Sequence, residues 1–528
     1  MIFYNGKIFT SRSGDDFVSA MAIKDGEIVA TGNDSIILGK LAVGAVIIDL
    51  QNKLVLPGFH DAHLHFWNGA KVKQQLDLRN TPSLEKTLEK IRTKVNQTNA
   101  GDWVIGRGWD HELWEQKNLP DKNLLDQIST SHYIYLKRVD GHAAWVNTPV
   151  LKLLGYGASA PDPFGGRIMR YPNNEPNGIL FDAAYDTLDK MIPKPTPDQQ
   201  YEWTKQAIAF ANEMGITSIT DNSETDIYGV YSQLYKKGEL NLRINFWMSY
   251  LHNLDSLKNY VESNGTVPHY LRGDLIKLYA DGSLGSRTAY LLRPYDDDPT
   301  NVGLPQYPSE KLLAMAKHSI ENNLFVGIHA IGDAGVREAL NVYESIARVD
   351  PDRDYRFRIE HAQMIDPEDI DRFQKLNVIA SMQPSHCITD LHWAEKCIGE
   401  RARYAYTWKT FLDSGITLAF GTDWPVEPLN PMVGLYAAIT RQDTAGYPEG
   451  GWYPQEQITL AQAIIAYTYG SAYAARNEDW CGTLEPGKVA DFIIVDRDIF
   501  TIPPAEILRT KVLSTYLDGK KVFSRTTH

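Results

Sequence analysis

The chain has 528 residues, of which 43% are hydrophobic and 23% are charged, and its formal net charge is −13 at pH 7. This composition is ordinary for a globular protein, and no apolar stretch is long enough to cross a bilayer, so we expect no membrane span. The negative charge and the lack of a long basic run argue against nucleic acid as a partner.

The first residues, MIFYNGK, reach the turn residues Asn5 and Gly6 without the basic start and apolar run of a secretory signal. Only three cysteines occur, Cys387, Cys397 and Cys481, and they form no C-x-x-C pair. We therefore expect a cytoplasmic protein with reduced, structural thiols.

Short β-rich runs separated by turns occupy both ends of the chain. An Asp25-Gly26 turn lies between two such runs near the start, and an Asp518-Gly519 turn lies between two near the end. We predict that residues 1–54 and 481–528 pair into one small β-sandwich domain.

The region between these ends alternates short apolar runs with helical patterns, which is typical of parallel βα units. We predict an α/β fold, with a TIM-like (β/α)8 barrel over residues 55–480. The eight predicted barrel strands are 54–65, 216–221, 243–250, 275–281, 325–331, 357–363, 378–382 and 417–423. The clearest predicted helices are 201–214, 311–321, 336–347 and 460–475.

Residues 70–200 are too many for the connection of a single βα unit, and they carry their own Trp-, Pro- and Gly-rich segments. We interpret them as an insertion within the barrel domain, after the first strand and over the barrel mouth.

The strongest local motif is PGFHDAHLHF at residues 57–66, in which His63 and His65 are two apart at the end of a predicted strand. Side chains at that spacing share a face, and two imidazoles on one face form half of a metal site. Alone, the H-x-H pattern is weak, because two unrelated structural histidines would produce it as well.

Further candidate ligands lie at or near the C-terminal ends of other predicted strands: Lys277, His329, His361 and Asp423. In a (β/α)8 barrel these strand ends converge on one mouth, where such enzymes keep their active sites. The sequence therefore predicts that five strands contribute to one metal site.

This set of residues resembles the ligand set of the amidohydrolase superfamily, and in particular the amidohydrolase 3 branch, whose members are similar to N-substituted formamide deformylases. The resemblance covers almost the whole chain. Supporting motifs are RVDGHAAW at 138–145, DGSLGSR at 281–287 and GTLEPGKVAD at 482–491.

The resemblance implies a centre of one or two divalent metal ions, with zinc the expected metal. In it, His63, His65 and Asp423 would bind one ion, and His329 and His361 the other. Lys277 would bridge them, either as an N6-carboxylated lysine or, as the alternative, unmodified beside a single ion. Asp423 would also be the catalytic acid and base, transferring a proton from the attacking hydroxide to the departing nitrogen.

Four residues are candidates for contact with substrate: Trp109, His142, Arg287 and His386. Each could instead have a purely structural role, since tryptophans are more often packing residues and loop histidines or arginines often satisfy buried polar groups.

We predict a hydrolase that cleaves a non-peptide C–N bond in a small amide or N-substituted formamide. Two alternatives stay open: the same site used for isomerase, dehydratase or esterase chemistry, and a non-catalytic barrel that binds a ligand. The expected partner is a small amide-like molecule, and the resemblance suggests a homodimer.

Overall fold

The computed structural model describes residues 1–139, 142–250 and 254–526. These form two compact units: Met1–Gly69 with Thr204–His528, and Ala70–Trp203. Within the described ranges no helix is both long and apolar enough to cross a membrane. The three cysteines are buried free thiols.

The first unit is built around an eight-stranded sheet in which each neighbouring pair runs parallel. All six residues of its first strand are buried, as expected where both faces of a parallel sheet are covered. The predicted TIM-like barrel is thereby confirmed. Its strands in order are β8 (Phe59–Leu64), β15 (Ile216–Asn222), β16 (Arg243–Ser249), β17 (Leu271–Tyr279), β18 (Phe325–Ala330), β19 (Arg358–His361), β20 (Ile379–Met382) and β21 (Leu418–Phe420).

The last barrel strand is tied to the first just beyond its C-terminal end. The main-chain N–H of Asp423 donates to the carbonyl oxygen of His63 at 2.7 Å, and that of His65 donates to the carbonyl of Trp424 at 2.8 Å. The carboxylate of Asp61 accepts from the Thr422 N–H at 3.0 Å and from its hydroxyl at 2.5 Å. These bonds fix two predicted metal ligands, His63 and Asp423, side by side.

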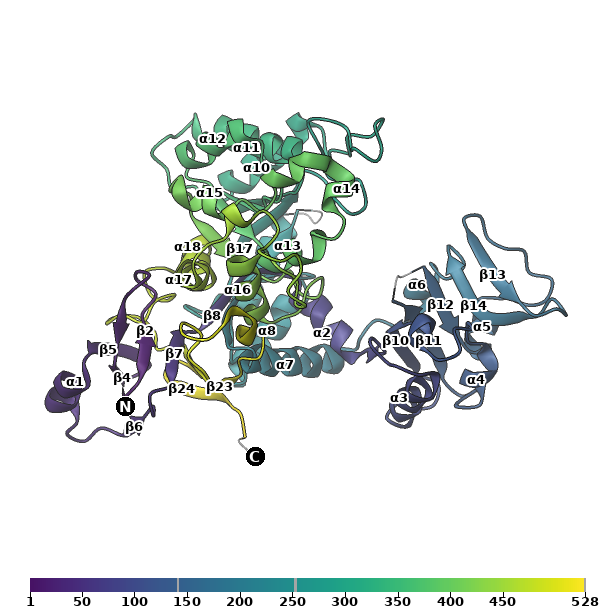
Figure 1. Cartoon of the computed structure of the whole chain (residues 1–528), viewed down its shortest axis with the longest axis horizontal. Helices are drawn as coiled ribbons and strands as arrows, with labels where there is room; N and C mark the ends of the chain where they lie inside the picture. Colours follow the sequence, from purple (N-terminus) through teal and green to yellow (C-terminus); the bar gives the residue numbers. More distant parts are fainter. Residues whose placement is uncertain (140–141, 251–253, 527–528) are drawn as a thin grey trace. The chain divides into compact units, whose positions relative to one another are not determined.

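Helices follow the barrel strands and cover them (Figure 1). Each predicted helix is present, although 460–475 is α-helical only at its two ends and forms a π-helix over Ala466–Gly470. The helices are α7 (Pro197–Glu213), α8 (Ile227–Lys236), α9 (Leu254–Asn264), α10 (Ser309–Glu321), α11 (Asp333–Ala347), α12 (Ile370–Lys375), α13 (Pro384–Asp390), α14 (Ala394–Ile398), α15 (Trp408–Asp413), α16 (Pro431–Thr440), α17 (Leu460–Ile465) and α18 (Ser471–Ala474). A further helix, α19 (Pro504–Ile507), belongs to the C-terminal segment.

The prediction of one continuous barrel strand over 54–65 is wrong. The strand is interrupted at Gly58, so that β7 (Leu54–Pro57) joins the terminal β-domain and only β8 belongs to the barrel. Gly58 lies so close to Thr217 that a Cβ at this position would be 2.2 Å from the threonine hydroxyl. Only glycine allows the chain to pass this close to the second barrel strand.

Strands from both ends of the chain build the terminal β-domain. One sheet has the order β5-β4-β1-β6 and the other β24-β23-β22-β7-β2-β3, and Figure 1 shows the purple and yellow ends of the chain together in it. Phe3, Phe492 and Tyr516 pack in its core, with 4.4 Å between the stacked rings of the last two. The strands are β1 (Ile2–Tyr4), β2 (Lys7–Phe9), β3 (Phe17–Val18), β4 (Ala20–Lys24), β5 (Glu27–Gly32), β6 (Ile47–Asp49), β22 (Phe492–Val495), β23 (Val512–Leu517) and β24 (Lys520–Ser524), with helix α1 at Asp34–Leu41.

A buried ion pair joins this domain to the barrel. Arg243, at the start of β16 and 1% exposed, donates to both carboxylate oxygens of Asp491 at 2.5 and 2.9 Å, and it also contacts Asp518. Asp491 ends the GTLEPGKVAD motif and Asp518 lies in the predicted Asp-Gly turn. Both segments at the end of the chain therefore anchor on one barrel arginine.

The second unit is a six-stranded mixed sheet of order β13-β14-β12-β11-β10-β9, with a hydrophobic core on each face. It comprises residues that we predicted as an insertion, and its placement over the barrel mouth stays a prediction. Its elements are α3 (Leu84–Asn96), α4 (Lys122–Asp126), α5 (Thr148–Leu153), α6 (Leu188–Met191), β9 (Leu76–Asp77), β10 (Trp103–Trp109), β11 (Tyr133–Arg138), β12 (Ala143–Val146), β13 (Gly166–Arg170) and β14 (Pro176–Asp182), while α2 (Phe66–Gln74) leads into it from the barrel.

We expect Asp491→Asn to destabilise the protein by about 3 kcal/mol, because it leaves the Arg243 guanidinium buried without its main counter-ion. Urea unfolding followed by tryptophan fluorescence measures this loss. The control is Arg348→Met, which removes an exposed pair with Glu344 and should change the free energy of unfolding by less than about 1 kcal/mol. Equal, small effects of both substitutions would contradict the anchoring role of Arg243.

Candidate metal centre

Four histidines from three strands cluster at the C-terminal end of the barrel. His63 is on β8 with His65 directly after it, His329 is on β18 and His361 ends β19. Their ring centres are 5.7 Å apart for His63 and His65, 5.1 Å for His63 and His361, and 4.5 Å for His329 and His361. The structure thus brings together side chains that are up to 298 positions apart in sequence.

Asp423 lies among these histidines with its two carboxylate oxygens facing different partners. Oδ1 is 3.3 Å from Nε2 of His65 and 3.7 Å from Nε2 of His63, whereas Oδ2 is 3.2 Å from Nε2 of His386. The backbone of Asp423 is left-handed, with φ of 56°. A non-glycine residue in this conformation is strained, and such strain is concentrated at functional sites.

Each of the four clustered histidines has one ring nitrogen bound to an oxygen acceptor. Nδ1 of His63 bonds Glu360 at 2.6 Å, Nδ1 of His65 bonds the Asn222 carbonyl at 3.0 Å, and Nδ1 of His361 bonds Gln383 at 2.8 Å. His329 is reversed, since its Nε2 bonds the Gly282 carbonyl at 2.9 Å. Such outer partners fix the tautomer and orientation of metal-binding histidines and leave the other nitrogen for the metal.

A buried charge network holds the Glu360 carboxylate in place beneath His63. Arg358 donates to Glu360 at 2.5 and 3.1 Å, and the Ser381 hydroxyl donates to it at 2.7 Å. Burial alone would raise the pKa of Glu360, but Arg358 and His63 hold this pKa well below its usual value. Glu360 is therefore an anion at neutral pH and a strong acceptor for the His63 ring.

Burial also sets the protonation of the clustered histidines. It lowers the pKa of His63 to about 4 and that of His329 to about 3, with Lys277 contributing in the same direction, and it lowers the pKa of His361 well below the usual value. Neutral imidazole is the form that binds metals. At pH 7 these three rings have the charge state of ligands.

Lys277, on β17, is 1% exposed, and its Nζ lies 3.0 Å from Nε2 of His63. Burial lowers the pKa of Lys277 to about 8, against the opposing effect of the Glu360 and Asp423 carboxylates. The structure therefore places Lys277 within the histidine cluster and favours loss of its proton more than in water.

These residues fit a divalent cation. Imidazole nitrogens and carboxylate oxygens are the donors that zinc accepts, and nitrogen and oxygen atoms of His63, His65 and Asp423 lie within 4.8 Å of one another. The Oδ1 atom of Asp423 is buried and, among the described residues, has no hydrogen-bond partner. A buried carboxylate oxygen without a hydrogen bond destabilises the folded protein unless a cation pairs with it.

Sequence reasoning missed the outer acceptors Glu360 and Gln383. Alternation along a strand predicts that neighbours face opposite sides, so Glu360 was not expected to share a site with His361. The left-handed backbone of His361, with φ of 70°, breaks that alternation. Gln383 begins the QPSH segment that supplies His386, and this proximity was the one available signal.

The four residues predicted to contact substrate lie in different parts of the structure. His386 lies at the metal centre. Arg287 is paired with Asp297 and bonds the Gly285 carbonyl, so its guanidinium holds its own loop. Trp109 is fully buried in the core of the second unit and donates to the Leu136 carbonyl, so the structure gives it a packing role in place of the predicted substrate contact.

His142 is exposed on the second unit and pairs with Asp182 at 2.9 Å. Asp140 and Gly141, from the same RVDGHAAW motif, lie outside the described residues. A substrate role for His142 stays a prediction.

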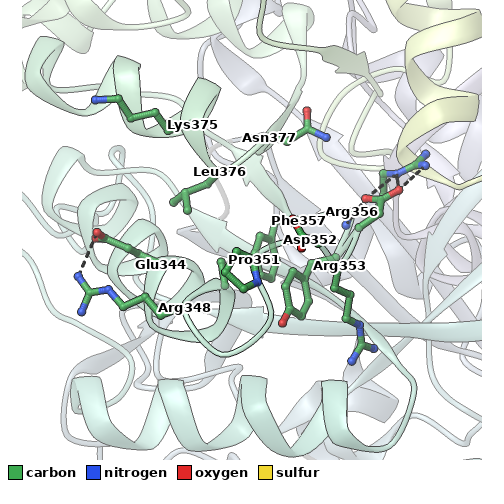
Figure 2. Close-up of a pocket in the computed structure, with 13 residues that line it drawn as sticks. Glu344, Arg348, Pro351, Asp352, Arg353, Arg356, Phe357, Lys375, Leu376 and Asn377 are labelled. Atoms are coloured by element: carbon green, nitrogen blue, oxygen red, sulfur yellow. Dashed lines mark hydrogen bonds and ion pairs between the residues drawn. The ribbon is translucent and has the colours of Figure 1, made fainter.

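Figure 2 shows a surface hollow of about 490 Å³ that lies near the N-terminal ends of two barrel strands, whereas the histidines lie at the C-terminal ends. Residues that line it, including Arg356 and Asn377, precede β19 and β20. Arg356 is paired with Asp354 and Glu478, and Arg348 with Glu344.

Comparison with known proteins shows which family this chain resembles over its length. The model of the amidohydrolase family matches residues 46–523. Protein LONG AFTER FAR-RED 3 of Arabidopsis thaliana is 33% identical over 98% of this chain and 91% of its own length, and an N-substituted formamide deformylase of Arthrobacter pascens is 25% identical over 100% and 98%. The crystal structure of a metal-dependent hydrolase from Pyrococcus furiosus is 29% identical, with a TM-score of 0.77 over 94% of this chain and 99% of that chain.

The resemblance inferred from the residues is thereby confirmed. The match spans the barrel and segments from both ends of the chain, and it includes every strand that carries a clustered histidine. The chain belongs to the amidohydrolase family.

Proposed function

We propose that this chain cleaves a non-peptide C–N bond in a small amide or N-substituted formamide. Its family and the metal-dependent hydrolase from Pyrococcus furiosus support metal-dependent hydrolysis as the general activity. The formamide deformylase from Arthrobacter pascens supports the choice of bond. The observation that carries the proposal is the Asp423 carboxylate, shared among histidines at the barrel mouth.

A divalent cation supplies two things when bound: it polarises a carbonyl group and lowers the pKa of a bound water toward neutrality. The residues that would hold it are His63, His65 and Asp423, with His329, His361 and Lys277 available for a second ion. Zinc is the proposed metal, because the donors are nitrogen and oxygen. Carboxylation of Lys277 would add two anionic oxygens and is part of the proposal.

Asp423 is the proposed acid and base. Hydrolysis forms a C–O bond to water and breaks the C–N bond, so one proton must leave the water and one must reach the departing nitrogen. An ionised carboxylate beside the bound cation can accept the first proton and deliver it to the nitrogen. Protonation of the nitrogen lets it leave as a neutral amine.

Three further predictions remain part of the proposal: a cytoplasmic location, a homodimer, and a small amide-like molecule rather than nucleic acid as partner. Product analysis separates the alternatives for the chemistry. A free amine with formate or another carboxylate supports hydrolysis, and a product isomeric with the substrate supports isomerisation.

We expect Asp423→Asn to lower kcat by about 10²–10⁴-fold on N-formyl and N-acyl amines, because an amide cannot exchange the required proton. Release of free amine by the zinc-loaded protein is the measurement, and removal of metal with a chelator should abolish release until zinc is restored. The control is Asp413→Asn, which alters an exposed carboxylate paired with Lys409. Equal turnover by Asp423→Asn and the unmutated protein would remove Asp423 from the mechanism.

Gln383→Met should weaken zinc binding by about 10–100-fold, because the His361 ring loses the acceptor that orients it while the side-chain volume is nearly kept. Calorimetric titration of metal-free protein with zinc measures the affinity. Gln374→Met, an exposed position on α12, is the matched control. The orienting role is wrong if the two variants bind zinc equally well.

A further inference from the structure

His386 has the contacts of a metal ligand although the motif resemblance assigns it no such role. It lies on α13, directly after β20, with 15% of its side chain exposed. Its Nε2 is 3.2 Å from Oδ2 of Asp423, and its Nδ1 is 3.3 Å from Oε1 of Glu427. The His386 ring therefore lies between the carboxylate of Asp423 and that of Glu427, which is outside the histidine cluster.

The orientation of the His386 ring matches that of three clustered histidines. In His63, His65 and His361, Nδ1 is bound to an oxygen acceptor. His386 repeats this arrangement with Glu427 as its acceptor. A carboxylate behind the imidazole is the outer partner that metal-binding histidines commonly have.

Asp423 divides the donors into two groups. Its Oδ1 faces His63 and His65, while its Oδ2 faces His386, and the ring centre of His386 is 6.0 Å from that of His361. One ligand atom from each of His361, His386 and Asp423 lies within 4.8 Å of the other two, as in the group His63, His65 and Asp423. A carboxylate with each oxygen directed at a different group of nitrogens is suited to join two cations.

We propose that His386 is a metal ligand and that His361, His386 and Asp423 form a second cation position, which shares Asp423 with the first. This proposal rests on the metal-dependent function above. Two imidazoles and one carboxylate leave one position of a four-coordinate zinc ion open, as in catalytic zinc sites. The second ion then has a protein carboxylate and two imidazole nitrogens as ligands.

The competing explanation is that His386 only orients Asp423 through a hydrogen bond, or contacts substrate. Either role would change turnover, so activity alone cannot separate them from ligation. Metal stoichiometry and the spectrum of a bound metal do separate them, because only the loss of a ligand changes how many ions are held and in what geometry.

The test uses full-length protein stripped of metal and then loaded with zinc or cobalt(II). Metal per chain is measured by mass spectrometry after gel filtration, affinity by calorimetry, and coordination by the visible absorption of cobalt(II). The control is His392→Asn, since His392 lies just beyond α13, is half exposed and pairs with Asp443 outside the cluster. We expect His386→Asn to hold one ion fewer per chain than the unmutated protein and to alter the cobalt spectrum, and His392→Asn to change neither.

The proposal is overturned if His386→Asn binds the same number of ions with the same affinity and spectrum as His392→Asn. His63→Asn distinguishes this failure from failure of the proposed function. If the unmutated protein binds ions and His63→Asn lowers that binding while His386→Asn does not, only the role of His386 is wrong. If the unmutated protein binds no divalent ion, both proposals fail.

Glu427→Leu is a second variant in case His386→Asn does not fold. It removes the acceptor behind the His386 ring and leaves the ring itself. We expect the weaker of the zinc affinities to fall by about 10–100-fold. An unchanged affinity in this variant would equally overturn ligation by His386.

Discussion

The structure depends on the junction between the first and last barrel strands, where Asp423 meets His63. The main-chain N–H of Asp423 donates to the His63 carbonyl, while its side chain approaches the His63 and His65 rings. One residue therefore ties the barrel together and lies in the candidate metal centre. Because Asp423 has both positions, the closure of the barrel determines where the candidate ligands lie.

The centre also requires a buried scaffold behind the ligands. Arg358 and Ser381 hold the Glu360 carboxylate, and Glu360 in turn holds the His63 ring. A buried carboxylate with so little exposure to water is stable only when a cation and hydrogen bonds compensate its charge. The same requirement explains why Arg358 precedes Glu360 by two positions, since residues at that spacing on a strand share a face.

The barrel and the positions of the candidate ligands were predictable from the sequence because they follow local rules. Apolar runs alternating with helical patterns predict parallel βα units, and His329 or His361 stands out because a polar residue ends a buried run. The break at Gly58 was not predictable, since it depends on the close approach of Thr217 from a distant strand. The choice between substrate contact and packing for Trp109 could not be made from the sequence, because only the packed sheet of the second unit shows that its indole is enclosed.

The contacts of His386 show the limit of reading motifs from a sequence. The QPSH segment placed this histidine after the seventh predicted barrel strand, close enough to suggest substrate contact. Which of its nitrogens faces Asp423 depends on Glu427, which belongs to the loop after the eighth strand. Relations between side chains from different loops become visible only in three dimensions.

The most direct test is an anomalous difference map at the zinc absorption edge, from crystals of the unmutated protein grown with zinc. The account predicts a peak about 2.0–2.2 Å from Nε2 of His63, Nε2 of His65 and a carboxylate oxygen of Asp423. Zinc bound only elsewhere on the protein, with none among these three side chains, would contradict it.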